Sequence, residues 1–224
     1  MRLLCLNPNG SATTTDVIRG VADSWAHEHP GCTVVTRYLP GAPELLVTQD
    51  DSDAVAGRVR EQIRDLPALG FDAMVVACHG DPGLPVGRED SSIPVVGVGW
   101  ASMATAASTG SWGVICISPA IADDKIGQAV RYGLGAPDYL VGAGRNDYET
   151  ASPAAAADLT AIVDGMVARG IRSTVLGCAT MSALAPTVRE RTGADVIEPI
   201  AAGLDAAIRL LARRMPGAVL PAAR

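Results

Sequence analysis

The stretch DAMVVACHGDPGL, residues 72–84, has a counterpart in RSTVLGCATMSAL, residues 172–184. In each stretch a short apolar run, typical of a buried β-strand, ends at a cysteine and is followed by small and polar residues. Cys78 and Cys178 therefore occupy the same place in two similar units, about 100 residues apart. This match indicates that the chain contains two copies of one structural unit.

Two further pairs of segments extend the repeat in the same order. They are LLCLNPNGSATTTD at 3–16 with GVICISPAIADDK at 113–125, and IPVVGVGWASMATAA at 93–107 with ADVIEPIAAGLDAAI at 194–208. The first of these pairs places Cys5 over Cys116 and Pro8 over Pro119. Three matches in order favour internal duplication over chance similarity between unrelated segments.

Short apolar runs rich in β-branched residues alternate with longer segments of helical periodicity. The predicted strands lie at 3–6, 33–38, 73–77, 94–98, 112–117, 139–141, 174–176 and 196–197. The predicted helices lie at about 14–29, 52–66, 100–109, 121–132, 153–169, 181–191 and 200–214. This alternation predicts an α/β fold of two duplicated parallel-sheet domains related by pseudo-twofold symmetry. We expect one domain at 1–98 plus 205–224 and the other at 99–204, with the active site in the cleft between them.

The composition is that of a compact globular protein with a substantial core. The chain has 224 residues, of which 48% are hydrophobic and 19% charged, and its formal net charge is −6. An acidic chain without basic clusters is not expected to bind nucleic acid or an anionic membrane. The apolar run at the N-terminus is too short for a signal peptide, and no stretch is long enough to span a bilayer, so we expect a cytoplasmic protein. The five cysteines form no C-x-x-C pair, so neither a disulfide framework nor a zinc site is expected.

The chain contains a single lysine, Lys125, in the segment IADDKIGQAV. Pyridoxal phosphate chemistry needs a Schiff-base lysine, and a phosphate-binding loop of the G-x-x-x-x-G-K-[ST] type needs one as well. Lys125 falls in the first turn of a predicted helix, which matches neither context. We therefore expect chemistry that depends on neither.

A cysteine at a strand end is often only a small buried apolar residue. Two cysteines at equivalent strand ends favour a second interpretation, in which both thiols react. Ligands bind beyond the carboxyl ends of parallel strands, so a pseudo-twofold axis would bring the two thiols to opposite walls of one cleft. Backbone N–H groups of the following loops could lower the pKa of each thiol and bind an oxyanion. Cys5, Cys32 and Cys116 lie within or at the start of predicted strands, and we assign them to the core.

Two polar features accompany the cysteines. The loop NPNGSATTT at 7–15 combines turn-forming residues with helix caps, and Asn7 or Asn9 also has the chemistry to hydrogen-bond a substrate. His79 either raises the thiolate population of Cys78 or points into solvent. Because successive side chains diverge, a direct pair between Cys78 and His79 is the less favoured arrangement.

The motifs NPNGS, ACHGDPGL and LGCATM together resemble the Asp/Glu racemase superfamily, and within it the hydantoin racemase and allantoin racemase group. The resemblance extends from Leu3 to about Leu211. It implies a racemase of 5-substituted hydantoins or related cyclic ureides such as allantoin. It also implies a homo-oligomer that uses no cofactor and no metal.

By this resemblance Cys78 and Cys178 are the catalytic pair. One cysteine, as thiolate, removes the proton from C5 of the ring, and the other, as thiol, delivers a proton to the opposite face. Loop amides would stabilise the negative charge that develops on the ring carbonyl. The expected substrate-binding residues are Asn7, Pro8, Asn9, His79, Gly80, Ser118, Ala179 and Thr180.

Two positions depart from the family pattern. The group commonly has Phe after the first cysteine, where this chain has His79, and paired threonines where this chain has Ile117 and Ser118. Both positions should line the pocket, so the departures bear on the substrate more than on the chemistry. Arylmalonate decarboxylases are relatives that lack one of the two thiols, so the presence of both makes decarboxylation less favoured.

Two alternatives remain. Amino-acid racemisation, or cis–trans isomerisation of a small dicarboxylate as in maleate isomerase, would need basic groups beside the cleft, for which Arg88 and Arg145 are the candidates. A catalytically silent module would hold a small ligand in the same cleft, and its two thiols would be no more reactive than the other three.

Overall fold

The computed structural model of the protein describes residues 1–84, 91–143, 148 and 151–214. One group of strands consists of β1 (Arg2–Asn7), β2 (Thr33–Tyr38), β3 (Ala73–Val76) and β4 (Val95–Gly97). The other consists of β5 (Trp112–Cys116), β6 (Tyr139–Gly142), β7 (Ser173–Leu176) and β8 (Asp195–Ile197). They form two parallel sheets with the orders β2-β1-β3-β4 and β6-β5-β7-β8. The two orders are the same, which confirms the predicted α/β fold of two duplicated parallel sheets.

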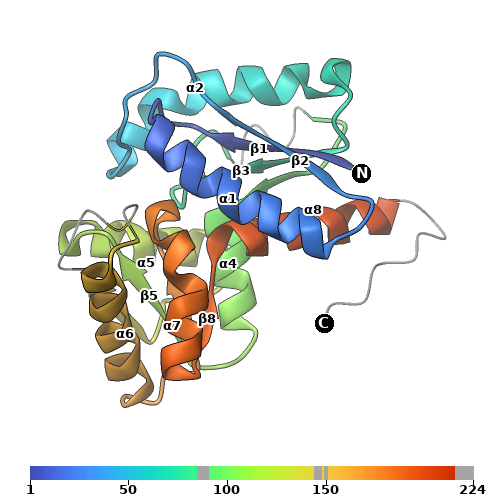
Figure 1. The fold of residues 1–224 in the computed structure, drawn as a ribbon. Coiled ribbons are helices and arrows are strands. Elements are labelled where there is room, and N and C mark those ends of the chain that lie inside the picture. Colours follow the sequence, from blue (N-terminus) through green and yellow to red (C-terminus); the bar gives the residue numbers. More distant parts are fainter. Residues whose placement is uncertain (85–90, 144–147, 149–150, 215–224) are drawn as a thin grey trace.

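Helices cover both sheets. They are α1 (Ala12–Glu28), α2 (Gln49–Asp65), α4 (Val98–Ala107), α5 (Ala122–Arg131), α6 (Pro153–Val167), α7 (Ala185–Thr192) and α8 (Pro199–Arg214), with the short 3-10 helices η1 (Leu66–Leu69), η2 (Pro119–Ile121) and η4 (Ala179–Leu184). Figure 1 shows the first sheet with α1 and α2 in the upper body, and the second sheet with α5, α6 and α7 in the lower one. The last helix, α8, returns to pack against α4 and against β3 and β4 of the first sheet. The division at 98/99 and 204/205 stays a prediction.

Local capping explains where several helices begin. Ser11 accepts a hydrogen bond from the Thr14 amide at the start of α1, and Thr48 and Asp51 form a reciprocal capping box at the start of α2. The helix predicted at 181–191 is instead the 3-10 helix η4 followed by α7. Pro186 lies in the first turn of α7, where its missing N–H costs nothing, so the α-helix begins only there.

The strand register corrects one alignment of the repeat. Leu3 of β1 and Trp112 of β5 pair with equivalent positions of β3 and β7. Asn7 therefore corresponds to Cys116, each being the last residue of its strand. The predicted match of Cys5 with Cys116 is wrong by two residues. Side chains alternate between the faces of a strand with a period of two, so a sequence comparison alone could not detect the slip.

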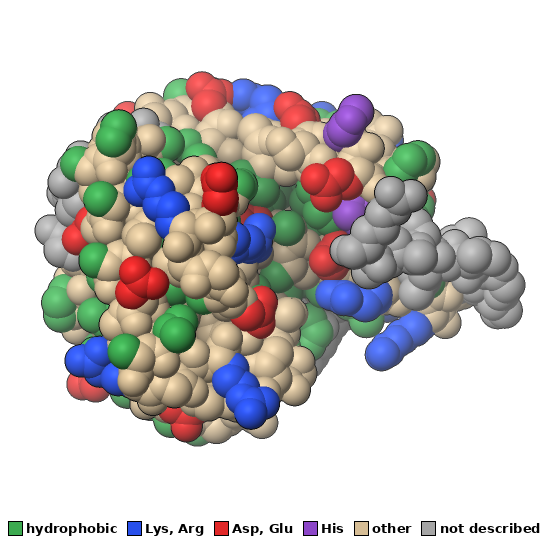
Figure 2. All heavy atoms as spheres, turned by 60° about the horizontal axis from the view of Figure 1, so that its bottom comes forward, with side chains coloured by type: hydrophobic (Ala, Val, Ile, Leu, Met, Phe, Trp, Pro, Cys, Tyr) green, Lys and Arg blue, Asp and Glu red, His purple; other side chains and the backbone are tan. Residues whose placement is uncertain are grey.

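Apolar clusters fill the space between each sheet and its helices. Cys5 belongs to the cluster between the first sheet, α1 and α8, and Cys116 is buried in β5, so both lie in the core as predicted. Cys32 is partly buried and packs against the first of these clusters. Among the described helices, none is long and apolar enough to cross a bilayer. On the face seen in Figure 2, acidic and basic side chains are interspersed with apolar ones.

Candidate active site

Two thiols meet at one cavity between the two halves of the fold. Cys78 follows β3 and Cys178 follows β7, and both side chains are half-buried. Together they line a small cavity of about 60 Å³. Because β3 and β7 hold the same position in their sheets, each half of the repeat supplies one thiol.

The surroundings of Cys78 act on its thiol in opposite directions. Burial raises the pKa of Cys78 to about 11. A hydrogen bond from the Gly80 backbone N–H and the positive charge of Lys125 both lower this pKa, whereas the negative charges of Cys178 and Asp81 raise it. The donor and the cation thus favour the thiolate form of Cys78 at a site where burial disfavours it.

The Cys178 thiol has a hydroxyl neighbour in its own loop. Its Sγ lies 3.1 Å from Oγ1 of Thr180, and Ala179 and Thr180 also line the cavity. A hydroxyl at this distance donates a hydrogen bond to a thiolate or accepts one from a thiol. Thr180 therefore suits either protonation state of Cys178.

Asp81 anchors the turn that follows Cys78. Its carboxylate accepts hydrogen bonds from the backbone amides of Gly99 (2.8 Å) and Trp100 (2.7 Å), and from the Tyr132 hydroxyl (2.6 Å). These amides belong to the first turn of α4, whose cap residue, Gly97, has no side chain. Asp81 thus caps α4 from another loop, in a left-handed backbone conformation with φ of 50°. Burial raises the pKa of its carboxyl to about 6, against the effect of these donors.

His79 is buried, with only 3% of its surface exposed, so the alternative that it points into solvent is wrong. Its Nε2 lies 3.3 Å from the Ser102 hydroxyl, and its Nδ1 lies 3.2 Å from Nζ of Lys125. Burial and the Lys125 charge lower the pKa of His79 well below its usual value, which keeps the ring neutral. Both ring nitrogens therefore face partners other than Cys78.

Lys125 comes to this site from α5, in the other half of the fold. Its ammonium donates to the His79 carbonyl oxygen (3.1 Å) and to Oε1 of Gln128 (3.0 Å), and the side chain lines the cavity with the two cysteines. The Gln128 side-chain amide donates to the same His79 carbonyl at 2.7 Å. Sequence reasoning placed Lys125 in the first turn of a helix, which is confirmed, but missed that this turn faces the cysteine loop.

The structure brings most of the predicted site residues to the cavity. Its lining includes Cys78, Cys178, Asn9, His79, Gly80, Ala179 and Thr180. Asn7, Pro8 and Ser118 do not belong to this lining. The Asn7 side-chain amide donates to Oδ1 of Asn9 and Oγ1 of Thr15, and the Ser118 hydroxyl accepts from the Ala120 amide. Substrate contact by these three residues stays a prediction.

Apolar side chains complete the cavity, and of these only Ile117 was expected there from the sequence. They are Leu45, Leu46 and Val47, from the segment between β2 and α2, with Ile117 and Ile121 from the second half. Ile117, not its neighbour Ser118, faces the cavity. Arg88 and Arg145, the basic residues considered for an anionic substrate, lie outside the described residues.

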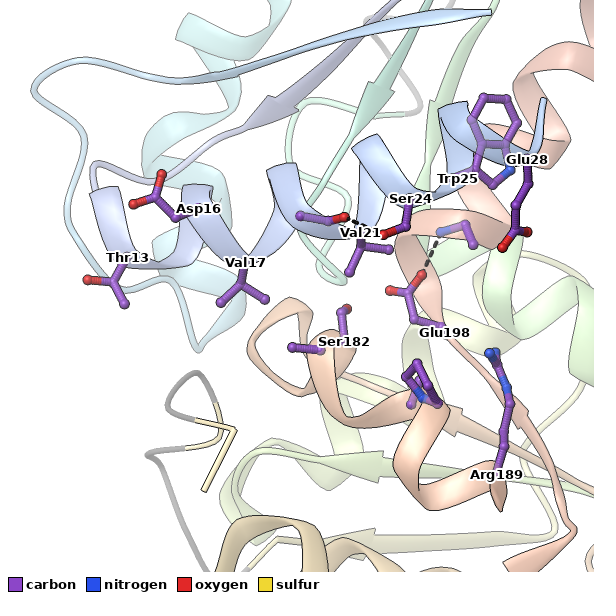
Figure 3. A pocket seen from close by; sticks show the side chains of 15 residues that line it. Thr13, Asp16, Val17, Val21, Ser24, Trp25, Glu28, Ser182, Arg189 and Glu198 are labelled. Carbon is purple, nitrogen blue, oxygen red and sulfur yellow. Dashed lines mark hydrogen bonds between the residues drawn. The ribbon is translucent and has the colours of Figure 1, made fainter. Parts of the chain in front are cut away.

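A second cavity, of about 680 Å³, lies between α1 and the segment η4–α7. Figure 3 shows Val17, Val21 and Trp25 of α1 on one side and Ser182 and Arg189 on the other. Glu198 also lines it, but its carboxylate accepts hydrogen bonds from the amides of residues 200 and 201 and so caps α8. This cavity contains no cysteine or histidine. The smaller cavity therefore remains the better candidate for proton transfer.

Metal binding has little support in the part of the chain that the structure covers. No three His, Cys, Asp or Glu side chains among the described residues lie close enough together to hold a metal ion.

Comparisons with known proteins show the family and the fold of the chain. A model of the Asp/Glu/hydantoin racemase family matches residues 3–207. A hydantoin racemase of Paenarthrobacter aurescens is 28% identical over 95% of this chain and 92% of its own length, and one of Rhizobium meliloti is 30% identical over 94% and 89%. The solved structure of an allantoin racemase from Klebsiella pneumoniae has a TM-score of 0.88 and 24% identity, covering 100% of this chain and 95% of that one, which shows the same fold.

Proposed function

Because this chain belongs to the Asp/Glu/hydantoin racemase family and is an isomerase of the racemase type, we propose that it racemises 5-substituted hydantoins or related cyclic ureides such as allantoin. The observation that carries this proposal is the pair of half-buried thiols, Cys78 and Cys178, on one cavity at equivalent strand ends. Racemisation needs proton transfer on two opposite faces of one carbon, and two similar groups on opposite walls are suited to it. Relatives named hydantoin racemase support the substrate class.

In the proposed reaction one cysteine enters as a thiolate and the other as a thiol. The thiolate takes the proton from C5 of the ring, and the electron pair of the C–H bond moves onto the adjacent ring carbonyl, which becomes an enolate. The second thiol then donates its proton to the opposite face of C5, and the carbonyl re-forms. The product is the other enantiomer, and the two cysteines have exchanged their protonation states. No cofactor is needed, because the electrons stay within the ring.

Loop residues around the thiols suit both proton transfers. The Gly80 amide donates to Cys78, and Thr180 lies within hydrogen-bond distance of Cys178. Burial raises the pKa of Cys78 to about 11, so its thiolate form depends on the stabilisation that the Gly80 amide and the charge of Lys125 provide. Amides of the two loops would stabilise the developing enolate, the species in which the ring carries the most negative charge.

The lining of the cavity favours a neutral ring with an apolar substituent. Leu45, Leu46 and Ile121 offer apolar contacts to a side chain at C5. The cation of this lining, Lys125, has three hydrogen-bond acceptors within the protein and so no N–H group left for a substrate carboxylate. An amino acid or a small dicarboxylate is therefore less favoured. A cytoplasmic homo-oligomer is part of the same proposal.

The proposal is tested by following optical rotation with L-5-isobutylhydantoin, S-allantoin, L-aspartate, L-glutamate and, by NMR, maleate. We expect loss of rotation with one or both cyclic ureides, above the spontaneous rate, and no reaction with the other three compounds. Reaction with aspartate, glutamate or maleate alone would overturn the substrate class in favour of another activity of the family.

Three serine variants test the mechanism in the same assay. Cys78→Ser and Cys178→Ser should each lower the rate by at least about 10³-fold, because a hydroxyl with a far higher pKa replaces a proton-transfer group. Cys32→Ser is the matched control, since Cys32 is also partly buried but lies before β2, away from the cavity, and should keep the wild-type rate. Near-wild-type turnover by either cavity variant would contradict the two-thiol mechanism.

A further inference from the structure

Lys125 is a buried cation that takes no direct part in proton transfer between the two thiols. Its side chain is 6% exposed, and its ammonium meets the His79 carbonyl, Oε1 of Gln128 and Nδ1 of His79 at 3.0 to 3.2 Å. Taking an ammonium ion out of water costs several kcal/mol unless acceptors and negative charge compensate it. The three acceptors are neutral, so the compensating charge has to come from other groups around the cavity.

Burial lowers the pKa of Lys125, and the groups that oppose this when they are ionised are Cys78, Asp81, Cys178 and Cys116, in order of decreasing effect. Asp81 already accepts three hydrogen bonds from α4 and Tyr132, so it is compensated independently of Lys125. Of these groups, the thiolate of Cys78 has the largest effect on the pKa of Lys125, and Cys78 directly precedes His79, whose carbonyl accepts from the ammonium. Lys125 and Cys78 are therefore electrostatic partners whenever Cys78 is deprotonated.

The contacts of Lys125 also fix the position of the cysteine loop. Lys125 and Gln128, both on α5, donate to the same carbonyl oxygen of His79. This carbonyl belongs to the same planar peptide group as the Gly80 N–H, which donates to Cys78. The His79 ring, held neutral, accepts at Nδ1 from the ammonium and faces Ser102 of α4 with Nε2. The helices α4 and α5, which come before and after β5 of the second sheet, thereby hold the loop that follows β3 of the first sheet.

We propose that Lys125 is a positioning residue for racemisation: its ammonium holds the Cys78 loop through the His79 carbonyl and stabilises the thiolate of Cys78 during turnover. This inference deepens the proposed two-thiol racemase and rests on it. Lys125 itself touches neither the ring nor the moving proton. The groups around the pair that also carry or change charge are His79, Asp81, Cys178 and Cys116.

The test compares Lys125→Gln with Arg131→Gln. Both variants replace a cation of α5 by glutamine, but Lys125 is buried at the cavity and Arg131 is exposed. Glutamine at 125 carries no charge and still offers N–H donors to the His79 carbonyl. Alkylation of Cys78 by iodoacetamide is followed by peptide mass spectrometry from pH 6 to 10 in the absence of substrate, because only the thiolate reacts.

We expect Lys125→Gln to slow alkylation of Cys78 about tenfold at pH 8 and to move its rise with pH upward by about one unit, the effect of losing a nearby opposite charge. The acid limb of the kcat/KM profile should move in the same direction. Arg131→Gln should match the wild type in both measurements, and Lys125→Arg, which keeps the charge, should recover most of the alkylation rate.

An unchanged Cys78 alkylation profile in folded Lys125→Gln would overturn the proposal, as would an equal effect in Arg131→Gln. If Lys125→Gln does not fold, Lys125→Met, which fills the same volume without charge, is measured in the same way with the same expectation. Absence of racemisation by the wild-type protein would refute the proposed function, whereas the alkylation series uses no substrate and decides the role of Lys125 on its own.

Discussion

Gly99 lies so close to the Cys78 loop that no side chain fits there. A Cβ atom at this position would lie 2.3 Å from the His79 carbonyl oxygen, 2.8 Å from Nε2 of Gln128 and 2.9 Å from Oδ2 of Asp81. Ordinary contact begins at 3.4 Å, so in Gly99→Ala the His79 carbonyl has to move away by about 1 Å. Because this carbonyl belongs to the residue after Cys78, the catalytic thiol moves with it.

The magnitudes favour a loss of both stability and activity. Overpacking costs about 1–3 kcal/mol, and weakening the 2.7 Å hydrogen bond from Gln128 to His79 costs about 1 kcal/mol more. The gain in helix propensity from glycine to alanine is at most about 1 kcal/mol. We therefore expect Gly99→Ala to lose about 2 kcal/mol of unfolding free energy and to have a Tm lower by roughly 4–8 °C. A 1 Å misplacement of a reacting group lowers kcat/KM about 10²-fold.

Gly20→Ala is the matched control for this prediction. Gly20 also lies in a helix, α1, but a Cβ atom there would have no atom within 4 Å. This variant should gain up to about 1 kcal/mol of stability and keep the wild-type kcat/KM. Polarimetry with L-5-isobutylhydantoin and thermal unfolding by circular dichroism measure the two effects. Wild-type activity and Tm in Gly99→Ala would refute the reasoning that the α4 backbone positions the Cys78 loop.

Two more predictions concern side chains around the thiols. Burial raises the pKa of Asp81 to about 6, above its value in an unfolded chain, so the folded protein binds this proton more tightly. The stability that this tighter binding adds is complete below the unfolded pKa and is lost as the pH rises through 6. In urea titrations, the unfolding free energy of the wild type minus that of Asp81→Asn should therefore be about 1 kcal/mol larger at pH 5 than at pH 8. An equal difference at both pH values would argue against this burial effect. Thr180→Val should lower kcat/KM about tenfold by removing the hydroxyl at 3.1 Å from Cys178, while Thr180→Ser keeps most of the rate; equal polarimetric rates in the two variants would contradict a role for that hydroxyl.

The fold and the two thiols were within reach of the sequence because the signals that mark them are local. Apolar runs that end at a cysteine identify strand ends, and the repeat of that pattern indicates two equivalent positions. The place of Cys78 and Cys178 on one cavity then follows from parallel-sheet geometry. What the repeat did not give correctly was the register of Cys116, because a shift of two residues leaves the same face of a strand buried.

The polar network behind Cys78 was not predictable in the same way. Lys125 and Gln128 are spaced as two polar residues on one face of a helix, a pattern that normally indicates a face exposed to solvent. Only the packing of α5 against the loop of the other half turns that face inward. Asp81 similarly lies in a segment whose residues are typical of a turn. Its role as a cap for α4 depends on the amides of Gly99 and Trp100, which are 18 and 19 residues away in the sequence.

Deuterium exchange at C5 in the two cysteine variants tests the two-thiol mechanism most directly. Each enantiomer of a 5-substituted hydantoin is incubated in D₂O with Cys78→Ser or Cys178→Ser, and deuterium at C5 is followed by NMR together with optical purity. Each variant keeps one base, so it should exchange the proton of one enantiomer with retention of configuration, and the two variants should act on opposite enantiomers. Racemisation by either variant, or exchange of the same enantiomer by both, would contradict the mechanism.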